Sequence, residues 1–199
     1  VEALGLQSYR IVAHDTGATV ARRLAIIDAD RVKKLVLINT EIPHHRPPLV
    51  PLLQKAMALP GSNLAFRTLL RSRAFARSSL GFAGCVVDLN LLEGDFRRYF
   101  IDFLAASPQR MQGQILYARG IDWAQLDALA EGHKRIKAEV LLLWGERDPF
   151  FPIAEARRMM PQFSSCRGLI PMADCRLLPH EEKPELVAQH LLEFFAPSA

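Results

Sequence analysis

Ser-Tyr-Arg-Ile-Val-Ala at positions 8–13 is followed directly by His-Asp-Thr-Gly at 14–17, and Val20, Leu24 and Ile27 then recur at helical spacing. The first run is rich in residues that favour strands, and apolar residues three or four positions apart favour an amphipathic helix. The stretch therefore predicts a strand, a tight turn and a helix in direct succession.

A second strand is expected at 33–39, where a nearly continuous apolar run follows two lysines. Runs of this kind suit a parallel sheet that is buried on both faces. Farther along the chain the pattern predicts strands at 139–144 and 166–171 and helices at 153–160 and 184–195. This alternation predicts an α/β fold with a parallel sheet, right-handed crossovers and helices on both faces.

The sequence changes character between these two halves. A Pro-rich run at 42–48 opens a region with helical patterns and no convincing strand. The expected helices are 49–59, 63–75, 94–105, 108–119 and 123–135. We therefore expect core residues 1–43, a helical cap at 44–135, and core residues 136–199.

The composition is that of an ordinary globular protein. Of the 199 residues, 50% are apolar and 23% are charged, and no apolar run reaches the roughly 20 residues that span a bilayer. The net charge of +4 is spread along the chain, so neither nucleic acid nor a membrane is an expected partner. Three cysteines without a Cys-x-x-Cys pair, and a start unlike a signal peptide, favour a cytoplasmic location.

Ala13 to Gly17 also has the small-x-nucleophile-x-small pattern of a nucleophile elbow, a sharp turn that presents a catalytic side chain above a sheet. Asp15 occupies the nucleophile position. The small residues at both ends are expected to let the strand and the helix approach closely. The alternative is that Asp15 only caps the helix, since Asp is favoured at helix N-termini.

In these features the chain resembles the α/β-hydrolase superfamily, in particular its aspartate-nucleophile branch of haloalkane dehalogenases and epoxide hydrolases. Residues 13–18 resemble the His-Asp-x-Gly elbow of that branch, and residues 35–40 resemble the strand that follows it. Residues 141–149 resemble the strand and Gly-x-x-Asp turn that carry the catalytic acid, here Asp148. The resemblance begins partway through the family fold, without its first four strands.

The resemblance implies a two-step hydrolysis. Asp15 would attack a carbon of a small apolar epoxide or haloalkane and form an alkyl ester, and a carboxylate ionised at pH 7 needs no base for this step. A histidine oriented by Asp148 would then activate the water that hydrolyses the ester. The backbone N–H of Thr16 would supply half of the oxyanion hole.

The sequence departs from the family at the histidine. When residues 182–184 are placed on the family's Glu-x-Pro, its Gly-His pair falls on Arg176 and Leu177, and the nearest imidazole is His180. In a helical turn, Leu177 and His180 would share a face about 4.5 Å apart along the axis, whereas in an extended chain they would be about 10 Å apart. His180 is expected to be the base in the first arrangement and a solvated side chain in the second.

Other side chains bear on the substrate and on cofactors. Thr16 stands where dehalogenases of this fold commonly carry Trp or Arg, which favours epoxide chemistry. Tyr117 is a candidate acid toward an epoxide oxygen or a packing residue, and Trp123 is expected to line an apolar pocket or to belong to the core. His44-His45 lacks a third metal ligand nearby, and no Gly-x-Gly-x-x-Gly turn is present, so we expect no metal and no cofactor.

Three hypotheses follow from the sequence. The first is a hydrolase with Asp15, Asp148 and His180 as its triad, acting on a small molecule. The second is a noncatalytic homologue that binds a small molecule. The third is an inactive fragment, because a sheet without the family's first strands leaves one edge open. A homodimer is compatible with each hypothesis.

Overall fold

The structure is a computed structural model that describes residues 1–196. The chain divides into two compact units, one formed by Val1–His45 with Trp123–Ala199 and the other by Arg46–Asp122. The boundaries expected from the sequence, with a cap at 44–135, stay a prediction.

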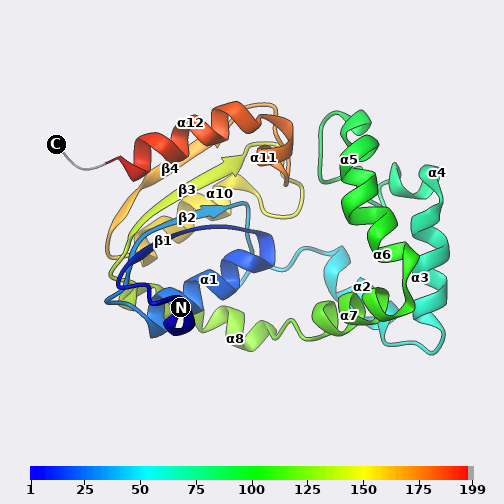
Figure 1. The fold of residues 1–199 in the computed structure, drawn as a ribbon, viewed down its shortest axis with the longest axis horizontal. Coiled ribbons are helices and arrows are strands. Elements are labelled where there is room, and N and C mark those ends of the chain that lie inside the picture. Colours follow the sequence, from blue (N-terminus) through cyan, green and yellow to red (C-terminus); the bar gives the residue numbers. More distant parts are fainter. Residues whose placement is uncertain (197–199) are drawn as a thin grey trace. The chain divides into compact units, whose positions relative to one another are not determined.

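The first unit contains a four-stranded parallel sheet with the order β1-β2-β3-β4 (Figure 1). The strands are β1 (Tyr9–His14), β2 (Val32–Ile38), β3 (Glu139–Gly145) and β4 (Cys166–Met172). Each lies within a residue or two of its predicted position, so the predicted parallel sheet is confirmed. The register pairs His14 with Ile38 and Ile38 with Leu143, so the carboxyl ends of β1, β2 and β3 meet at one edge.

Helices connect these strands and cover both faces of the sheet (Figure 1). In the first unit they are α1 (Asp15–Ile27), α8 (Trp123–Asp127), α9 (Leu129–Gly132), α10 (Ile153–Met159), α11 (Pro179–Glu182) and α12 (Pro184–Phe195). Short 3₁₀ turns are η1 (Glu2–Leu4), η4 (His133–Arg135) and η5 (Met160–Gln162).

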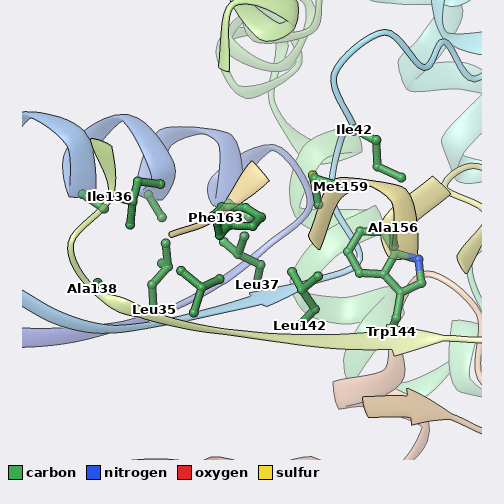
Figure 2. Close-up of a cluster of buried hydrophobic side chains, with 14 of the residues drawn as sticks. Leu35, Leu37, Ile42, Ile136, Ala138, Leu142, Trp144, Ala156, Met159 and Phe163 are labelled. Carbon is green, nitrogen blue, oxygen red and sulfur yellow. The ribbon is translucent and has the colours of Figure 1, made fainter. Parts of the chain in front are cut away.

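The larger hydrophobic core lies between the sheet and helices α1 and α10 (Figure 2). Leu35 and Leu37 of β2 pack there with Leu142 and Trp144 of β3, and all four are fully buried. Because successive residues of a strand point to opposite faces, alternate residues of β3, namely Val140, Leu142 and Trp144, belong to this core. The indole Nε1 of Trp144 donates a 2.7 Å hydrogen bond to the carbonyl of Phe151, so Trp144 is a core residue.

The alternate residues of the same strands form a second cluster on the other face. Val36 and Ile38 of β2 and Leu143 of β3 are buried there with Val187 of α12. Continuous apolar strands are therefore explained by burial on both sides, as the sequence predicted.

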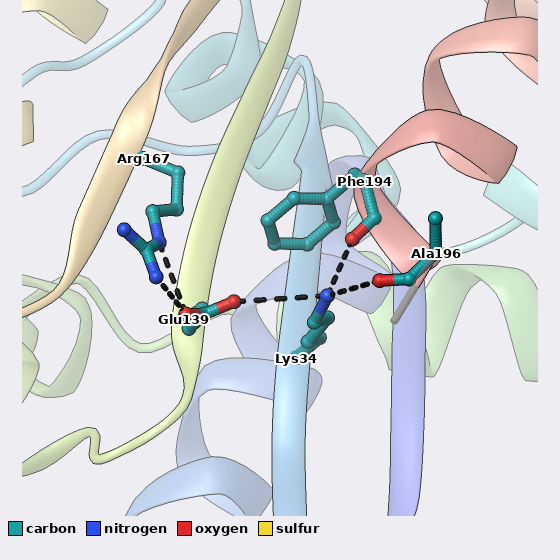
Figure 3. Close-up of polar contacts among 5 residues, drawn as sticks. All are labelled: Lys34, Glu139, Arg167, Phe194 and Ala196. Carbon is teal, nitrogen blue, oxygen red and sulfur yellow. Dashed lines mark hydrogen bonds and ion pairs between the residues drawn. The ribbon is translucent and has the colours of Figure 1, made fainter. Parts of the chain in front are cut away.

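Lys34 attaches the C-terminal end of α12 to the sheet (Figure 3). Its Nζ donates to the carbonyl oxygens of Phe194 at 2.6 Å and Ala196 at 3.1 Å, and it lies 3.8 Å from a carboxylate oxygen of Glu139 on β3. Arg167 of β4 binds the same carboxylate. The last carbonyls of a helix lack partners within the helix and carry partial negative charge, so a cation at this end is stabilising.

The second unit is helical and has its own core. Its helices are α2 (Leu49–Met57), α3 (Ser62–Arg71), α4 (Arg73–Ala76), α5 (Gly94–Phe96), α6 (Asp102–Ala106) and α7 (Pro108–Arg119), with the 3₁₀ turn η2 (Leu89–Leu92) and the π-helical turn η3 (Arg97–Ile101). Ile101, Met111 and Ile115 are buried at its centre. The helix expected at 94–105 is thus interrupted by a π-helical turn, a feature that periodicity does not reveal.

No helix among residues 1–196 is long and apolar enough to cross a membrane.

Candidate active site

Asp15 lies at the turn between β1 and α1 with a φ of 50°, in the left-handed region. A non-glycine residue there costs roughly 1–2 kcal/mol, although Asp tolerates it better than most. Two contacts from the segment after β2 hold this conformation: the N–H of Asp15 donates to the carbonyl of Asn39 at 2.9 Å, and the Thr40 hydroxyl donates to the carbonyl of Asp15 at 2.7 Å. The N-cap of α1 is His14 and no side chain makes a capping hydrogen bond there, so Asp15 is not the N-cap residue.

The small residues of the elbow act differently from what the sequence suggested. A Cβ added at Gly17 would meet no heavy atom within 4 Å, so Gly17 does not permit a close approach here. The close contact falls instead on Ala18, which is fully buried in the core between α1 and the sheet.

Asp148 follows β3 in a tight turn and is only 5% exposed. Its Oδ1 accepts hydrogen bonds from the backbone N–H groups of Phe150 at 2.7 Å and Phe151 at 3.1 Å, and its Oδ2 accepts one from Asn39 Nδ2 at 2.6 Å. Burial raises the pKa of Asp148, while these three hydrogen bonds stabilise the carboxylate and act in the opposite direction.

Asn39 joins the ends of three strands. It follows β2, its carbonyl binds the N–H of Asp15 after β1, and its side chain binds the turn after β3. In that turn the amide Nδ2 reaches Asp148, and Oδ1 accepts from the N–H of Gly145 at 2.8 Å. The fully buried Asn39 side chain therefore fixes the turn at Asp15 relative to the turn at Asp148.

The loop between β4 and α11 packs against the acid turn because residue 145 is glycine. A Cβ at Gly145 would lie 1.9 Å from the carbonyl oxygen of Arg176. The N–H of Arg147 also donates to the carbonyl of Cys175 at 2.9 Å. This contact brings the segment that leads to His180 to the same edge of the sheet as Asp148.

His180 lies in the single turn of α11, and the backbone between Leu177 and Pro179 is irregular, so the connection is neither a full helical turn nor an extended strand. Its ring contacts the ring of His14 edge-on, with centroids 4.5 Å apart, and its Nδ1 is buried without a hydrogen-bond partner. Among the residues that the structure describes, no hydrogen bond joins its imidazole to Asp148. Burial, with a further contribution from His14, lowers the pKa of His180 to about 4, so the ring is neutral at pH 7.

His14 links the elbow to the histidine loop. Its Nε2 donates to the carbonyl of Leu177 at 2.9 Å, across a sequence separation of 163 residues. Burial lowers the pKa of His14, so this ring is also neutral at pH 7. The side chain of Leu177 is partly buried and packs against the larger hydrophobic core.

The environment of Asp15 opposes its ionisation. Burial raises the pKa of Asp15 to about 7, Glu41 and Asp148 add to this effect, and a hydrogen bond from the backbone N–H of Thr16 acts against it. The Asp15 carboxyl group is therefore only partly ionised at neutral pH, whereas the sequence suggested full ionisation. Taken as a whole residue, Asp15 is half-buried.

The remaining predicted site residues stay predictions. Thr16 follows Asp15 in α1, and its N–H already bonds to the carboxylate of Asp15. Tyr117 lies on α7 in the helical unit and is 49% exposed. Trp123 is the first residue of α8 and is half-buried.

Sequence reasoning missed the polar segment Asn39-Thr40-Glu41, which is fully or almost fully buried. It also missed Arg22, a fully buried arginine one turn after Thr19 in α1. A signal was present: three consecutive polar residues follow an apolar strand at its carboxyl end, where ligands bind in parallel sheets. Within residues 1–196, no group of three or more His, Cys, Asp or Glu side chains is arranged to hold a metal ion.

Comparison with known proteins bears on the fold. A family model described as alpha/beta hydrolase fold matches residues 1–184. No protein of curated function matches the sequence.

Solved structures with a similar fold include several hydrolases. The 2-hydroxy-6-oxo-6-phenylhexa-2,4-dienoate hydrolase of Rhodococcus sp. strain RHA1 is 17% identical with a TM-score of 0.74, over 98% of this chain and 66% of that chain. A protein described as an ancestral haloalkane dehalogenase is 19% identical with a TM-score of 0.74, over 97% of this chain and 69% of that chain. A meta-cleavage product hydrolase of Pseudomonas fluorescens IP01 is 18% identical with a TM-score of 0.69, over 98% and 66%. These likenesses show the fold, and the chain spans about two thirds of the length of the proteins it matches.

Proposed function

Because the chain belongs to the alpha/beta hydrolase fold family, we propose that it supplies the nucleophile of a hydrolase that acts on a small apolar epoxide or haloalkane. The observation that carries this proposal is the conformation of Asp15. Asp15 has a left-handed backbone at the carboxyl end of a parallel strand and at the start of a helix, and backbone strain of this kind is concentrated at functional sites.

The first step needs an ionised Asp15. One carboxylate oxygen attacks the substrate carbon, a C–O ester bond forms, and the bond to halide or to the epoxide oxygen breaks with its electron pair. The released halide leaves as an anion, and an opened epoxide oxygen takes up a proton from water. The backbone N–H of Thr16 donates to the Asp15 carboxyl group. In the second step it would stabilise the negative charge that develops on the carbonyl oxygen of the Asp15 ester.

The second step hydrolyses the ester. A base removes a proton from water, the hydroxide attacks the carbonyl carbon of the Asp15 ester, and the alcohol departs with the proton. His180 is neutral at pH 7 and lies beside His14 at the elbow, so it can serve as this base once its free Nδ1 finds a partner. Catalytic hydrogen bonds are often looser without substrate and tighten when it binds.

Mass spectrometry tests the first step. The protein is incubated with styrene oxide or 1-bromobutane, digested, and searched for a peptide in which Asp15 carries the added mass. We expect the adduct in the unmodified protein and none in Asp15→Asn, while Asp174→Asn, an exposed control, keeps it. Failure to label Asp15 with any epoxide or haloalkane, at pH values from 6 to 9, would falsify the proposal.

A second candidate function is favoured by one specific observation. Both oxygens of Asp148 are occupied by Asn39 and by backbone N–H groups, and His180 Nδ1 has no partner. A protein in this state forms the ester and keeps it, which makes it a covalent binding protein. If one equivalent of Asp15 is labelled and no excess of product forms, the protein binds its ligand covalently. If product exceeds the amount of protein, and ¹⁸O from labelled water enters the Asp15 carboxyl group first, the protein turns the substrate over.

A further inference from the structure

A buried polar cluster lies directly behind the nucleophile turn and takes no part in the chemistry proposed above. We call it the Arg22 cluster; it consists of Thr19, Arg22, Thr40, Glu41 and His133. Four of these side chains are at most 4% exposed, namely those of Arg22, Thr40, Glu41 and His133. Burying this many polar groups is costly unless each finds a partner, so the cluster calls for an explanation.

Arg22 is the centre of the cluster. Its Nη2, which carries two protons, lies within donating distance of three oxygens: the hydroxyl of Thr19 at 2.7 Å, the carbonyl of Glu41 at 2.9 Å and the hydroxyl of Thr40 at 3.2 Å. On the other side, its Nη1 lies 3.4 Å from Nε2 of His133. Since the guanidinium is a donor only, His133 accepts at Nε2 and donates from Nδ1 to Gln162, at 2.9 Å. Burial and the neighbouring Arg22 lower the pKa of His133 to about 3, so the positive charge of the cluster stays on Arg22.

The hydroxyl groups of the two threonines connect Arg22 to the carboxylate of Glu41 and to Asp15. Thr19 donates to Glu41 Oε2 at 2.9 Å, and Thr40 lies within donating distance of both Glu41 Oε2, at 3.0 Å, and the carbonyl of Asp15, at 2.7 Å. A hydroxyl group has one proton, so Thr40 donates to one of these oxygens at a time. The shorter distance favours donation from Thr40 to the carbonyl oxygen of Asp15, and Thr19 donates to the carboxylate of Glu41.

The charged and titratable groups around Asp15 come from every neighbouring element. Arg22 lies on α1, His14 ends β1, Glu41 follows β2, Asp148 follows β3, and His180 on α11 touches His14. Both histidines are neutral at pH 7. The carboxylates of Glu41 and Asp148 therefore both oppose the ionisation of Asp15, while Glu41 also faces the positive charge of Arg22.

We propose that Glu41, anchored by Arg22 and Thr19 and bridged to the backbone of Asp15 through Thr40, is a positioning residue that governs when the nucleophile carries its negative charge. The inference rests on the proposed role of Asp15 as nucleophile. Glu41 acts in two ways: its charge opposes a second negative charge on Asp15, and its backbone carbonyl, bound by Arg22, anchors the segment from which the Thr40 hydroxyl holds the left-handed turn. Like charges close together in a buried site make ionisation of either one harder.

The test measures the ionisation of Asp15 directly, without any substrate. Side-chain carboxyl ¹³C NMR of aspartate-labelled protein follows the titration, with the Asp15 signal assigned by its loss in Asp15→Asn. We expect Glu41→Gln to lower the midpoint of Asp15 by about 1 pH unit. The control Glu131→Gln removes an equal charge from an exposed site of the same unit, and the midpoint should not move. An unchanged or raised midpoint in Glu41→Gln overturns the inference.

A second pair of variants separates positioning from charge and covers the case in which Glu41→Gln does not fold. Thr40→Val removes the hydroxyl that holds the carbonyl of Asp15, and Thr40→Ser retains it. We expect the rate of Asp15 labelling by styrene oxide to fall at least tenfold in Thr40→Val and to return within twofold of the original in Thr40→Ser. Equal rates in the two variants contradict a positioning role. If Asp15 is never labelled but the NMR midpoint still shifts in Glu41→Gln, the proposed hydrolase fails and the electrostatic inference stands.

Discussion

Asp15 carries two energetic costs at once, a left-handed backbone and a carboxyl group held where ionisation is unfavourable. Each lowers the stability of the folded protein, and each is useful to a nucleophile. The turn places the carboxyl group at the carboxyl end of β1, and poor solvation makes the ionised form reactive. Single substitutions should therefore separate stability from reactivity at this residue.

Asp15→Asn is expected to stabilise the protein above pH 7. Asn tolerates the left-handed turn and cannot ionise. The pKa of Asp15 is about 7 in the folded state and 3.8 in the unfolded state, so between these values the native state holds a proton that the unfolded state has lost. The stability contributed by this group is present below pH 4 and is lost as the pH rises to 7.

The free energy of unfolding of Asp15→Asn should thus exceed that of the unmodified protein by an amount that grows from pH 4 to pH 7. Above pH 7 this difference should level off at on the order of 2 to 4 kcal/mol. Urea denaturation at pH 4.5, 6 and 8 measures it. If the difference in free energy of unfolding is the same at all three pH values, the pKa of Asp15 is not raised in the folded protein.

Asn39→Ala is expected to destabilise the fold by about 2–4 kcal/mol, because it leaves the buried N–H of Gly145 and Oδ2 of Asp148 without partners. The φ of 26° at Asn39 adds to the cost, since alanine adopts positive φ less readily than asparagine. Thermal denaturation at pH 7 tests this against Asn90→Ala, an exposed position where less than about 0.5 kcal/mol is expected. Similar losses in both variants would refute the structural role of Asn39.

At the scale of elements, the approach of the histidine loop to the end of β3 depends on a single missing side chain. Gly145→Ala places a Cβ 1.9 Å from the carbonyl oxygen of Arg176, so the loop at 173–178 must move. We expect a loss of about 3 kcal/mol or more, with amide shifts concentrated in that loop and in α11.

Gly113→Ala on α7 is the matched control for this change. A Cβ at Gly113 meets nothing within 4 Å, and alanine favours a helix interior by about 1 kcal/mol over glycine. The control should therefore be neutral or stabilising. If Gly145→Ala is tolerated equally well, the close packing of the loop does not hold in solution.

At the scale of the whole molecule, the two units have separate hydrophobic cores. Ile115→Ala removes a buried side chain from the helical core and is expected to cost about 2–5 kcal/mol. Hydrogen exchange should accelerate in residues 46–122 far more than in β2 and β3. Leu116→Ala, one position along the same helix and 57% exposed, should change exchange little. Equal acceleration throughout the molecule would show that the two cores open as one cooperative unit.

Local patterns in the sequence determined the elements and their order. Strands 33–39 and 166–171 and the helix 108–119 were placed within a residue or two, because burial on one or two faces imposes a period that short windows reveal. The same patterns identified Asp15 at a strand-to-helix turn and Asp148 after a later strand.

Only the tertiary structure decided what surrounds those carboxylates. The bonds from Asn39 to Asp148 and from His14 to Leu177 join residues 109 and 163 positions apart, and they depend on strand register and loop packing rather than on local preference. The Arg22 cluster is likewise assembled from α1, the end of β2 and η4. Sequence thus determined which residue stands at the elbow, and the fold decided its ionisation, because pKa depends on burial and on charges brought close in space.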